Sequence, residues 1–187
     1  MKRILLYIGA LLSIIPYATV SAESITHNFD DMYDASPKQL VITPGSSSKL
    51  ATTTTDDDLT YTVSGSTNAK FWLDLHNREG SKVISINLPS KNDFVTVYSP
   101  TDAVAQVTIR YYYPEDPSSD DIKVYASADG SSYSDMSATG GSRGIINANI
   151  PIGSQYIKIV NKGNTSISIY YIQYTLQTCN CFRYVPE

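Results

Sequence analysis

The residue types best suited to ligand chemistry lie together between Trp72 and Arg78, in the run WLDLHNR. If this run is a strand, Trp72, Asp74 and His76 share one face, and Arg78 lies just beyond them. A flat indole can stack on an apolar ligand face, while the polar side chains hydrogen bond to hydroxyl groups. We therefore take these four residues as candidate ligand-binding residues. The alternative is that Trp72 is buried between two layers together with Phe71.

A second set of candidates combines a tyrosine run with a glycine-rich loop. Tyr112 shares a strand face with Arg110, whereas Tyr111 and Tyr113 face the other way. An exposed tyrosine can stack on a ligand, and Arg143, within the run GGSRG, can grip a carboxylate or a phosphate. Cross-strand packing and an ordinary hairpin connection are the structural alternatives. Tyr112 and Arg143 complete the candidate binding residues.

Catalytic motifs are sparse in this sequence. It contains two histidines, His27 and His76, and no His-Glu-x-x-His helix. The run GGSRG matches the letters Gly-x-Ser-x-Gly, but it lacks the strand-to-helix setting of a nucleophile elbow. Asp74 and Glu79 form the nearest carboxylate pair that glycoside hydrolysis could use. We expect a non-catalytic protein and no catalytic residue, with a polysaccharide hydrolase as the less favoured alternative.

Two acidic stretches could suggest a metal site. His27 precedes Asp30, Asp31 and Asp34 in a spacing that fits no ligand pattern, so we expect a solvated N-terminal segment. The run Asp56–Asp58 could attract calcium, but it lacks the alternating acids, the glycine and the distant glutamate of an EF-hand loop. No cofactor is therefore certain, and a structural calcium is possible.

The two cysteines, Cys179 and Cys181, lie close to the C-terminus in a short tail, residues 177–187. A Cys-x-Cys pair closes a very small ring and adds little stability, and two ligands alone make a poor zinc site. A local or intermolecular disulfide and a pair of free thiols both stay open.

The N-terminus has the pattern of a secretory signal. A basic start precedes the apolar run Ile4–Ile15, and small residues lead to Ala22, after which we expect cleavage. The apolar run is shorter than the roughly 20 residues of a membrane span, although an uncleaved anchor is the alternative. Residues 1–22 are thus predicted to be a signal peptide and residues 23–187 one domain, in a secreted, periplasmic or extracellular protein.

The charge of the chain argues against two classes of partner. The 187 residues carry a formal net charge of −4. Without Lys2 and Arg3, 12 basic residues face 18 acidic ones, a net charge of −6. An acidic chain with no basic cluster is a poor match for nucleic acid or for an anionic membrane. After removal of the signal, no apolar run is long enough to cross a bilayer.

Short alternating segments separated by turn residues recur along the chain, and no helical period persists. Polar, Thr-rich residues 46–58 indicate a loop or an edge region. This pattern predicts an all-β protein, a single antiparallel β-sandwich or jelly roll. The expected strands are Gln39–Thr43, Leu59–Val63, Lys70–His76, Val83–Leu88, Phe94–Tyr98, Val107–Tyr113, Ile122–Ala128, Ile145–Ile150, Tyr156–Val160 and Ile167–Leu176.

One hairpin resembles a known family. A strand leads into Ser127-Ala128-Asp129-Gly130, and the aromatic Tyr133 follows at the family's spacing, where the family usually has Trp. This pattern, with the strands around it over residues 104–176, resembles the galactose-binding-like jelly roll of discoidin domains and carbohydrate-binding modules. The resemblance implies ligands on loops at one end of a sandwich, often beside a structural calcium. It transfers no ligand-binding residue, and Tyr133 is expected to cover the edge of the core.

These observations favour a secreted, non-catalytic domain that binds carbohydrate or another cell-surface ligand. The alternative is a structural, adhesin-like subunit that joins a protein partner through its sheet edges or its cysteine tail. In overall style the chain resembles small secreted bacterial proteins.

Overall fold

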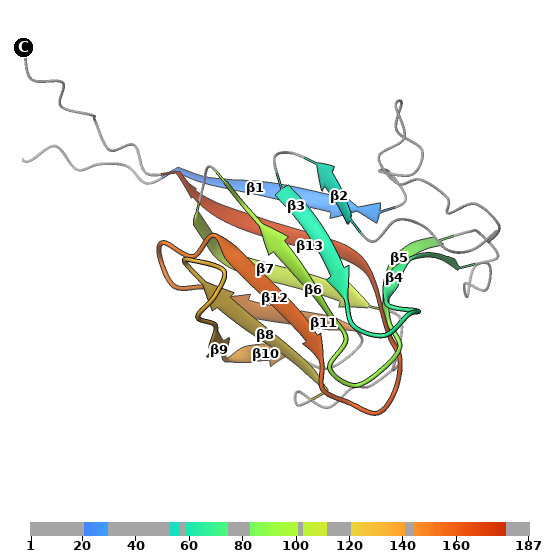
Figure 1. Cartoon of the computed structure of the whole chain (residues 1–187). Coiled ribbons are helices and arrows are strands. Elements are labelled where there is room, and N and C mark those ends of the chain that lie inside the picture. Colours follow the sequence, from blue (N-terminus) through green and yellow to red (C-terminus); the bar gives the residue numbers. More distant parts are fainter. Residues whose placement is uncertain are drawn as a thin grey trace, which may run out of the picture.

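The structure is a computed structural model, and it describes residues 21–29, 53–56, 59–74, 83–100, 103–111, 121–140 and 144–178. Within these residues thirteen strands form two antiparallel sheets that lie face to face, as Figure 1 shows. The predicted all-β fold, an antiparallel β-sandwich, is thereby confirmed. No helix among the described residues is long and apolar enough to cross a membrane.

Sheet A has the strand order β10-β11-β7-β13-β5-β4, and β1 also pairs with β13. The long β13 therefore lies in the middle of the sheet, with β7 on one side and β5 and β1 along the other. Its strands are β1 (Ser21–Asn28), β4 (Lys70–Asp74), β5 (Val83–Leu88), β7 (Ala103–Tyr111), β10 (Ala138–Gly140), β11 (Ile145–Asn149) and β13 (Ile167–Thr178).

Sheet B has the strand order β2-β3-β6-β12-β8-β9. Its three central strands, β6, β12 and β8, come from distant parts of the sequence. Its strands are β2 (Thr53–Asp56), β3 (Leu59–Ser64), β6 (Phe94–Tyr98), β8 (Ile122–Ser127), β9 (Ser134–Met136) and β12 (Tyr156–Asn161).

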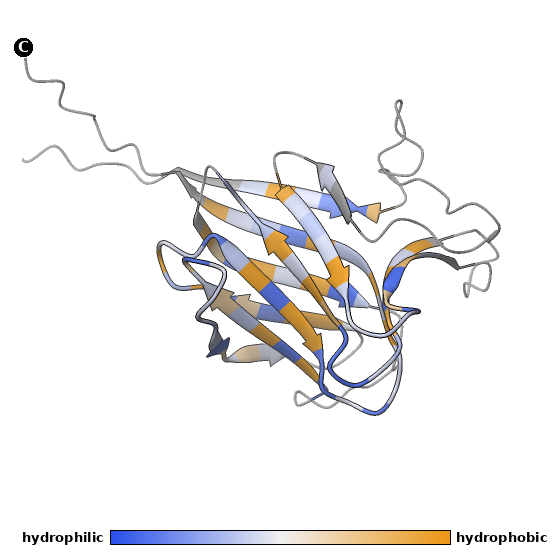
Figure 2. Cartoon of the chain, in the orientation of Figure 1, coloured by the Kyte–Doolittle hydropathy of each residue, from blue (hydrophilic) through white to orange (hydrophobic). Residues whose placement is uncertain are grey.

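Strict alternation assigns the two faces of sheet B. On β6, Val95 and Val97 are buried, while Phe94, Thr96 and Tyr98 are half-buried and face outward. The apolar positions of the strands in both sheets meet between the layers, and hydrophobic and hydrophilic residues alternate along the ribbons in Figure 2. Each fully buried Val, Leu or Ile contributes about 1.5–3 kcal/mol, so this interface holds the sandwich together.

A register shift changes the alternation along β13 of sheet A. On β13 the buried residues are Ile167 and Ile169 before a register shift, and Ile172 and Tyr174 after it. A bulge inserts one residue into one strand and so moves the following side chains to the opposite face. The bulge near Tyr171 therefore keeps both halves of a twelve-residue strand packed on one core.

The N-terminal segment departs from expectation. Instead of a solvated segment, the structure has β1, which pairs with β13 from Ser21 to Asn28. His27 is buried, and its Nδ1 is hydrogen bonded to the Tyr61 hydroxyl. The prediction of a solvated segment is therefore wrong for residues 23–29, because a partner 34 residues away satisfies the buried imidazole. Asp30, Asp31 and Asp34 lie outside the described residues.

His27 belongs to a set of rings between the sheets that we call the inner cluster. The rings meet edge to face or tilted, with centroids 5.4–6.5 Å apart. Burial raises the pKa of the Tyr174 phenol above its usual range, and the neighbouring Tyr61 hydroxyl opposes this shift. The members of the inner cluster are His27, Phe29, Tyr61, Phe71 and Tyr174.

Most other expected strands agree with the structure within a few residues. The expected edge region contains β2, which pairs with β3 alone among the described strands. β8 ends at Ser127, one residue before the predicted end. The three-residue strands β9 and β10 were not expected. The predicted strand Gln39–Thr43 lies outside the described residues.

Candidate binding groove

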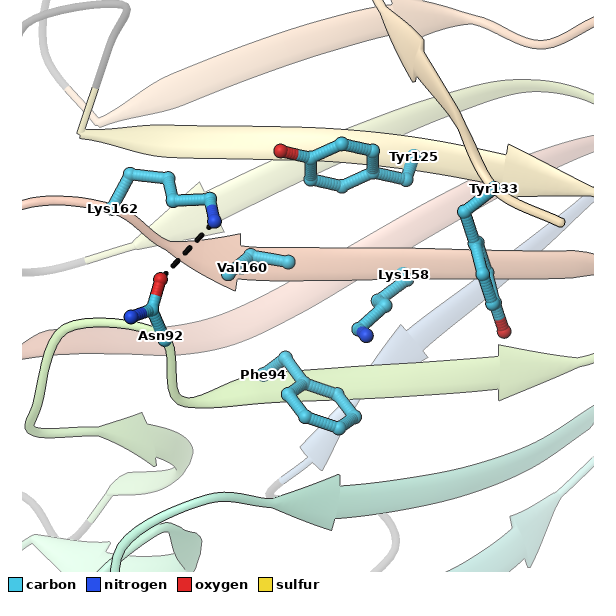
Figure 3. A pocket seen from close by; sticks show the side chains of 7 residues that line it. All are labelled: Asn92, Phe94, Tyr125, Tyr133, Lys158, Val160 and Lys162. Atoms are coloured by element: carbon cyan, nitrogen blue, oxygen red, sulfur yellow. Dashed lines mark hydrogen bonds between the residues drawn. The ribbon is translucent and has the colours of Figure 1, made fainter. Parts of the chain in front are cut away.

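The outward face of sheet B is hollowed where β6, β12 and β8 run side by side. The hollow has a volume of about 360 Å³, within the range of about 300–1,000 Å³ typical of small-molecule sites. We call it the outer groove, and Figure 3 shows its side chains. Its lining residues are Asn92, Phe94, Tyr125, Tyr133, Lys158, Val160 and Lys162.

Lys158 lies between aromatic rings from two different segments (Figure 3). Its Nζ is 3.9 Å from the ring centroid of Phe94 on β6 and 5.3 Å from that of Tyr133, in the turn between β8 and β9. An ammonium within about 6 Å of a ring centroid is attracted by the negative face of the ring. These two contacts fix the direction of the lysine stem while leaving its charge uncompensated.

Lys162 occupies the other end of the outer groove, just after β12. Its Nζ donates a hydrogen bond of 3.1 Å to the side-chain oxygen of Asn92 (Figure 3). It also lies 6.0 Å from the ring centroid of Tyr125 on β8. Both partners are neutral, so neither of them offsets the charge of the ammonium.

A buried aspartate shapes the turn that carries Asn92. The carboxylate of Asp93 accepts hydrogen bonds of 2.6 and 2.8 Å from the amide and hydroxyl of Ser66, and one of 2.8 Å from the Ser90 amide. Asn92 itself has a φ of 71°, a conformation that asparagine tolerates better than most residues. Because these bonds hold both sides of the turn, the Asn92 amide is fixed at the rim of the outer groove.

The turn after β8 places Tyr133. The Ser127 hydroxyl accepts N–H bonds from Asp129 and Gly130, at 3.3 and 3.0 Å, and donates to the Asp129 carboxylate at 2.9 Å. That carboxylate accepts the amides of Ser131 and Ser132 at 2.8 and 2.9 Å. These bonds, led by the Ser132 amide, lower the pKa of Asp129 from 3.8 to about 2. The carboxylate therefore stays ionised and ties the turn together.

Gly130 brings this turn against the sheet. Its φ is +72°, and a Cβ there would lie 3.0 Å from the ring of Tyr156 on β12. Glycine is thus required both by the backbone and by the close approach. The predicted turn at Asp129-Gly130 is confirmed.

Tyr133 is not where the sequence suggested. It was expected to cover the edge of the core, but its half-buried ring lies on the outward face of sheet B and lines the outer groove. Burial raises the pKa of its phenol, and a hydrogen bond with the Thr96 side chain partly opposes that shift. Thr96 is on β6, so the turn after β8 reaches across β12 to contact it.

The aromatic surface continues beyond the outer groove. Tyr98 and Tyr156 are register partners on β6 and β12, and their rings stack with centroids 4.6 Å apart and planes inclined by 22°. Tyr156 also contributes to the raised pKa of the Tyr133 phenol. A row of rings therefore extends along sheet B from the groove.

The candidate residues proposed from sequence are not brought together among the described residues. Trp72 is half-buried on β4 of sheet A, while its neighbour Phe71 is fully buried in the inner cluster. The two side chains thus point to opposite faces, as alternation predicts, so Trp72 does not share the core position of Phe71. Asp74 is the last residue of β4, and its side chain is outside the described part. The remaining candidates, His76, Arg78, Tyr112 and Arg143, and also Glu79, Cys179 and Cys181, lie outside the described residues.

The lysines of the outer groove were missed for a definable reason. Alternation within Tyr156-Ile157-Lys158-Ile159-Val160 places Lys158 outward, and the same argument places Phe94 outward on β6. That β12 lies between β6 and β8 is a property of the strand order, which no local pattern encodes. The individual faces were therefore predictable, whereas their juxtaposition was not.

Metal binding is not supported within the described residues, where no group of three or more His, Cys, Asp or Glu side chains could hold an ion. Asp57 and Asp58 lie outside this part of the chain. The possible structural calcium therefore stays a prediction.

No protein-family model matches the chain, and no curated protein matches it. Solved structures similar to it include CBM32 of AlyQ in complex with 4,5-unsaturated mannuronic acid, with 16% identity, a TM-score of 0.42, and coverage of 61% of this chain and 92% of that one. Another is the K2 cleaved adhesin domain of Lys-gingipain (Kgp), with 15% identity, a TM-score of 0.42, and coverage of 82% and 99%.

A third similar structure is CBM32-1 from a family 31 glycoside hydrolase of Clostridium perfringens, with 16% identity, a TM-score of 0.38, and coverage of 49% of this chain and 75% of that one. CBM32 domains are carbohydrate-binding modules, the kind of protein that the Ser127–Gly130 hairpin resembles. At these identities and TM-scores the likeness carries no argument about a site or a ligand.

Proposed function

We propose that the chain is a secreted, non-catalytic domain that binds carbohydrate in the outer groove. The observation that carries this proposal is the arrangement of three rings around one hollow. Phe94, Tyr125 and Tyr133 come from three different segments and line the same space of about 360 Å³.

The chemistry of the outer groove suits a sugar. A pyranose has apolar C–H faces that stack on flat rings, and its hydroxyls need donors and acceptors at the ring edges. The groove supplies donors from Lys158 and Lys162 and an amide from Asn92 between its rings. A mixed lining of this kind matches an amphipathic ligand better than a purely apolar one.

A protein-docking role finds less support on the described surface. Only two large hydrophobic residues, Ile145 and Ile152, are exposed among the described residues. Protein interfaces usually have a contiguous apolar patch at their centre, and isolated exposed side chains do not make one. The adhesin-like alternative would therefore have to use sheet edges or the tail with Cys179 and Cys181.

The lining of the outer groove also favours binding without catalysis. Glycoside hydrolysis ordinarily requires two carboxyl groups that flank the scissile bond. The described lining residues are aromatic, aliphatic, amide and lysine side chains, with no carboxylate among them. A ligand held there meets groups that bind and orient it but none that would act as the acid–base pair.

Secretion is the part of the proposal that rests on the N-terminal sequence. Cleavage after Ala22 would leave Glu23 as the first residue and retain most of β1, which begins at Ser21. Mass spectrometry of the protein recovered from the producing cell's exterior or periplasm should identify Glu23 as the N-terminus. Recovery of the chain with Met1 intact in the cytoplasm would contradict this part of the proposal.

A glycan array with the purified protein, run with and without calcium, tests the binding function. We expect binding to at least one glycan, and loss of that binding in Tyr125→Ala. Tyr171→Ala is the matched control, because Tyr171 is a half-buried tyrosine on sheet A with Arg110 4.5 Å from its ring centroid. Failure to bind any glycan in either condition, or equal loss in both variants, would defeat the proposal.

A further inference from the structure

We propose that the outer groove selects acidic polysaccharides, and that Lys158 and Lys162 recognise acidic groups on the sugar chain. The inference rests on the carbohydrate-binding function proposed above and adds the ligand's charge. It concerns the outward face of sheet B, not the loops at the end of the sandwich.

Charge is distributed unevenly between the chain and this site. The whole chain has a formal net charge of −4, yet both charged residues that line the outer groove are lysines. A concave site lined by one sign of charge concentrates ligands of the opposite sign. The positive charge of the groove therefore predicts an anionic ligand, although the chain as a whole is acidic.

The partners that the structure gives the two ammonium groups are neutral. Lys158 contacts two rings, and Lys162 contacts a ring and the neutral oxygen of Asn92. Among the described residues, no carboxylate pairs with either lysine. An ammonium has three donors, so hydrogen-bonding capacity remains at both lysines for a ligand. Carboxylate and sulfate oxygens form the strongest bonds with such donors.

The lysines are also held in place before a ligand arrives. The Nζ of Lys158 lies over the rings of Phe94 and Tyr133, and the Nζ of Lys162 is held by Asn92. Ordering a flexible side chain at an interface costs about 0.5–1.5 kcal/mol, and part of that cost is already met by folding. This distinguishes the pair from lysines that extend freely into solvent.

The two lysines reach the outer groove from its two ends. The Nζ of Lys158 lies over Phe94, the register partner of Val160, and so leans along β12 toward Lys162. The Nζ of Lys162 lies 6.0 Å from the ring of Tyr125, the register partner of Lys158, and so leans the opposite way. Both ammonium groups therefore face a ligand that lies in the groove beside the rings of Phe94 and Tyr125.

Carboxylates at the rim restrict the charge density of the ligand. Asp129 lies close enough to Tyr133 to raise the pKa of its phenol, and Asp135 on β9 is the register partner of Tyr125. Both would repel acidic groups that extend beyond the lysines. The outer groove therefore fits a chain with one acidic group per sugar unit better than a dense polyanion.

The test compares two polymers with the same backbone. Calorimetry would measure binding of the purified protein to polygalacturonate and to its methyl ester, which lacks the negative charge. Dextran sulfate tests sulfate as the acidic group, and polyglutamate provides a polyanion without sugar. We expect binding to polygalacturonate at least about tenfold tighter than to the ester, the effect of losing one hydrogen bond to a charged group. That binding should weaken as salt is added.

Variants connect the selectivity to the outer groove. Lys158→Gln and Lys162→Gln remove one charge each and keep a polar side chain of similar reach, and each should weaken polygalacturonate binding several-fold. Lys70→Gln on β4 of sheet A removes the same charge elsewhere and should leave binding unchanged. Dextran sulfate binding that Lys158→Gln weakens and Lys70→Gln does not would assign the preference to sulfate within the same proposal.

Several outcomes would overturn the inference. Equal binding of polygalacturonate and its ester, abolished by Tyr125→Ala, would show that the groove binds sugar without selecting charge. Equal binding of polyglutamate would show that charge alone is recognised. Binding of neutral glycans on the array but of no acidic polymer would reject the inference while leaving the proposed function intact, whereas no glycan binding in either experiment would reject both.

Discussion

Two groups of aromatic residues lie at different depths of the same sandwich, and each surrounds a nitrogen-containing side chain. In the inner cluster, fully buried Tyr61 meets three other rings and the imidazole of His27. In the outer groove, Lys158 lies over half-buried Phe94 and Tyr133. The residue types are similar, but inside the protein His27 and Tyr61 are hydrogen bonded to each other, whereas the outer ammonium groups keep hydrogen-bonding capacity for a ligand. Whether a polar group already has a hydrogen-bond partner in the protein, more than the number of rings around it, distinguishes a structural cluster from a binding surface.

The largest effect should follow from emptying the inner cluster. Tyr61→Ala removes a fully buried ring and leaves both a cavity and an imidazole without its hydroxyl partner. We expect the free energy of unfolding to fall by about 3–5 kcal/mol, as for other buried aromatic-to-alanine changes. Urea unfolding followed by circular dichroism would measure this loss. A loss below about 1 kcal/mol would mean that the inner cluster does not stabilise the packing of the two sheets.

Tyr61→Phe tests the hydrogen bond of the inner cluster alone, because it removes only the hydroxyl group. The ring contacts persist, but the hydroxyl that is hydrogen bonded to His27 Nδ1 is gone. A buried polar group left without its partner costs about 1–3 kcal/mol, so stability should fall by that amount. The same urea experiment measures it. Because β1 carries His27, hydrogen exchange should also accelerate in β1 more than in β12; uniform acceleration would show a global effect instead.

The inner cluster also explains why β1 was not predicted from the sequence. Most strands show apolar alternation in the sequence. Those expected between Leu59 and Leu176 were found with small errors at their ends, whereas the short strands β9 and β10 were missed. β1 was missed because a histidine takes one of its inward positions, where a local pattern calls for an apolar side chain. The signal that makes His27 an interior residue is Tyr61, 34 positions later. Contacts of that separation cannot be read from neighbouring residues.

The binding surface was harder to predict for a related reason. Reasoning from sequence favoured Trp72 to Arg78, where suitable side chains are contiguous. The outer groove instead combines Phe94, Tyr125 and Lys158 from three strands, and none of them is conspicuous alone. Alternation gave each residue its correct face, but only the strand order made them neighbours.

Removing a ring from the outer groove should affect stability far less. Tyr125 is half-buried on β8 and lies 6.0 Å from Lys162 Nζ, so Tyr125→Ala loses a weak cation–π contact and some packing. We expect a loss of about 1 kcal/mol or less in the free energy of unfolding, together with the loss of glycan binding. Urea unfolding and the glycan array would be run on the same preparation. A destabilisation equal to that of Tyr61→Ala would remove the distinction between the two clusters.

The smallest effect on stability is expected only at acidic pH, and it concerns the turn that holds Tyr133 in the outer groove. The Asp129 carboxylate has a folded-state pKa of about 2, below its usual 3.8, chiefly because it accepts the Ser132 and Ser131 amides. A depressed carboxyl pKa stabilises the fold above the unfolded-state pKa, and this contribution disappears as the pH falls toward the folded-state value. Asp129→Asn keeps an acceptor oxygen but no charge, so it lacks this pH dependence. The stability difference between the two proteins should therefore shrink between about pH 4 and 2.

Urea midpoints measured through that range would test this expectation. Asp135→Asn, on the neighbouring strand β9, separates the loss of a charge from the loss of charged hydrogen bonds within the turn. Parallel curves for wild type and Asp129→Asn would show that the carboxylate does not hold the turn. Converging curves would show that Tyr133 keeps its place through an ionised acid at the surface, in contrast to the inner rings, which packing and the His27–Tyr61 bond hold.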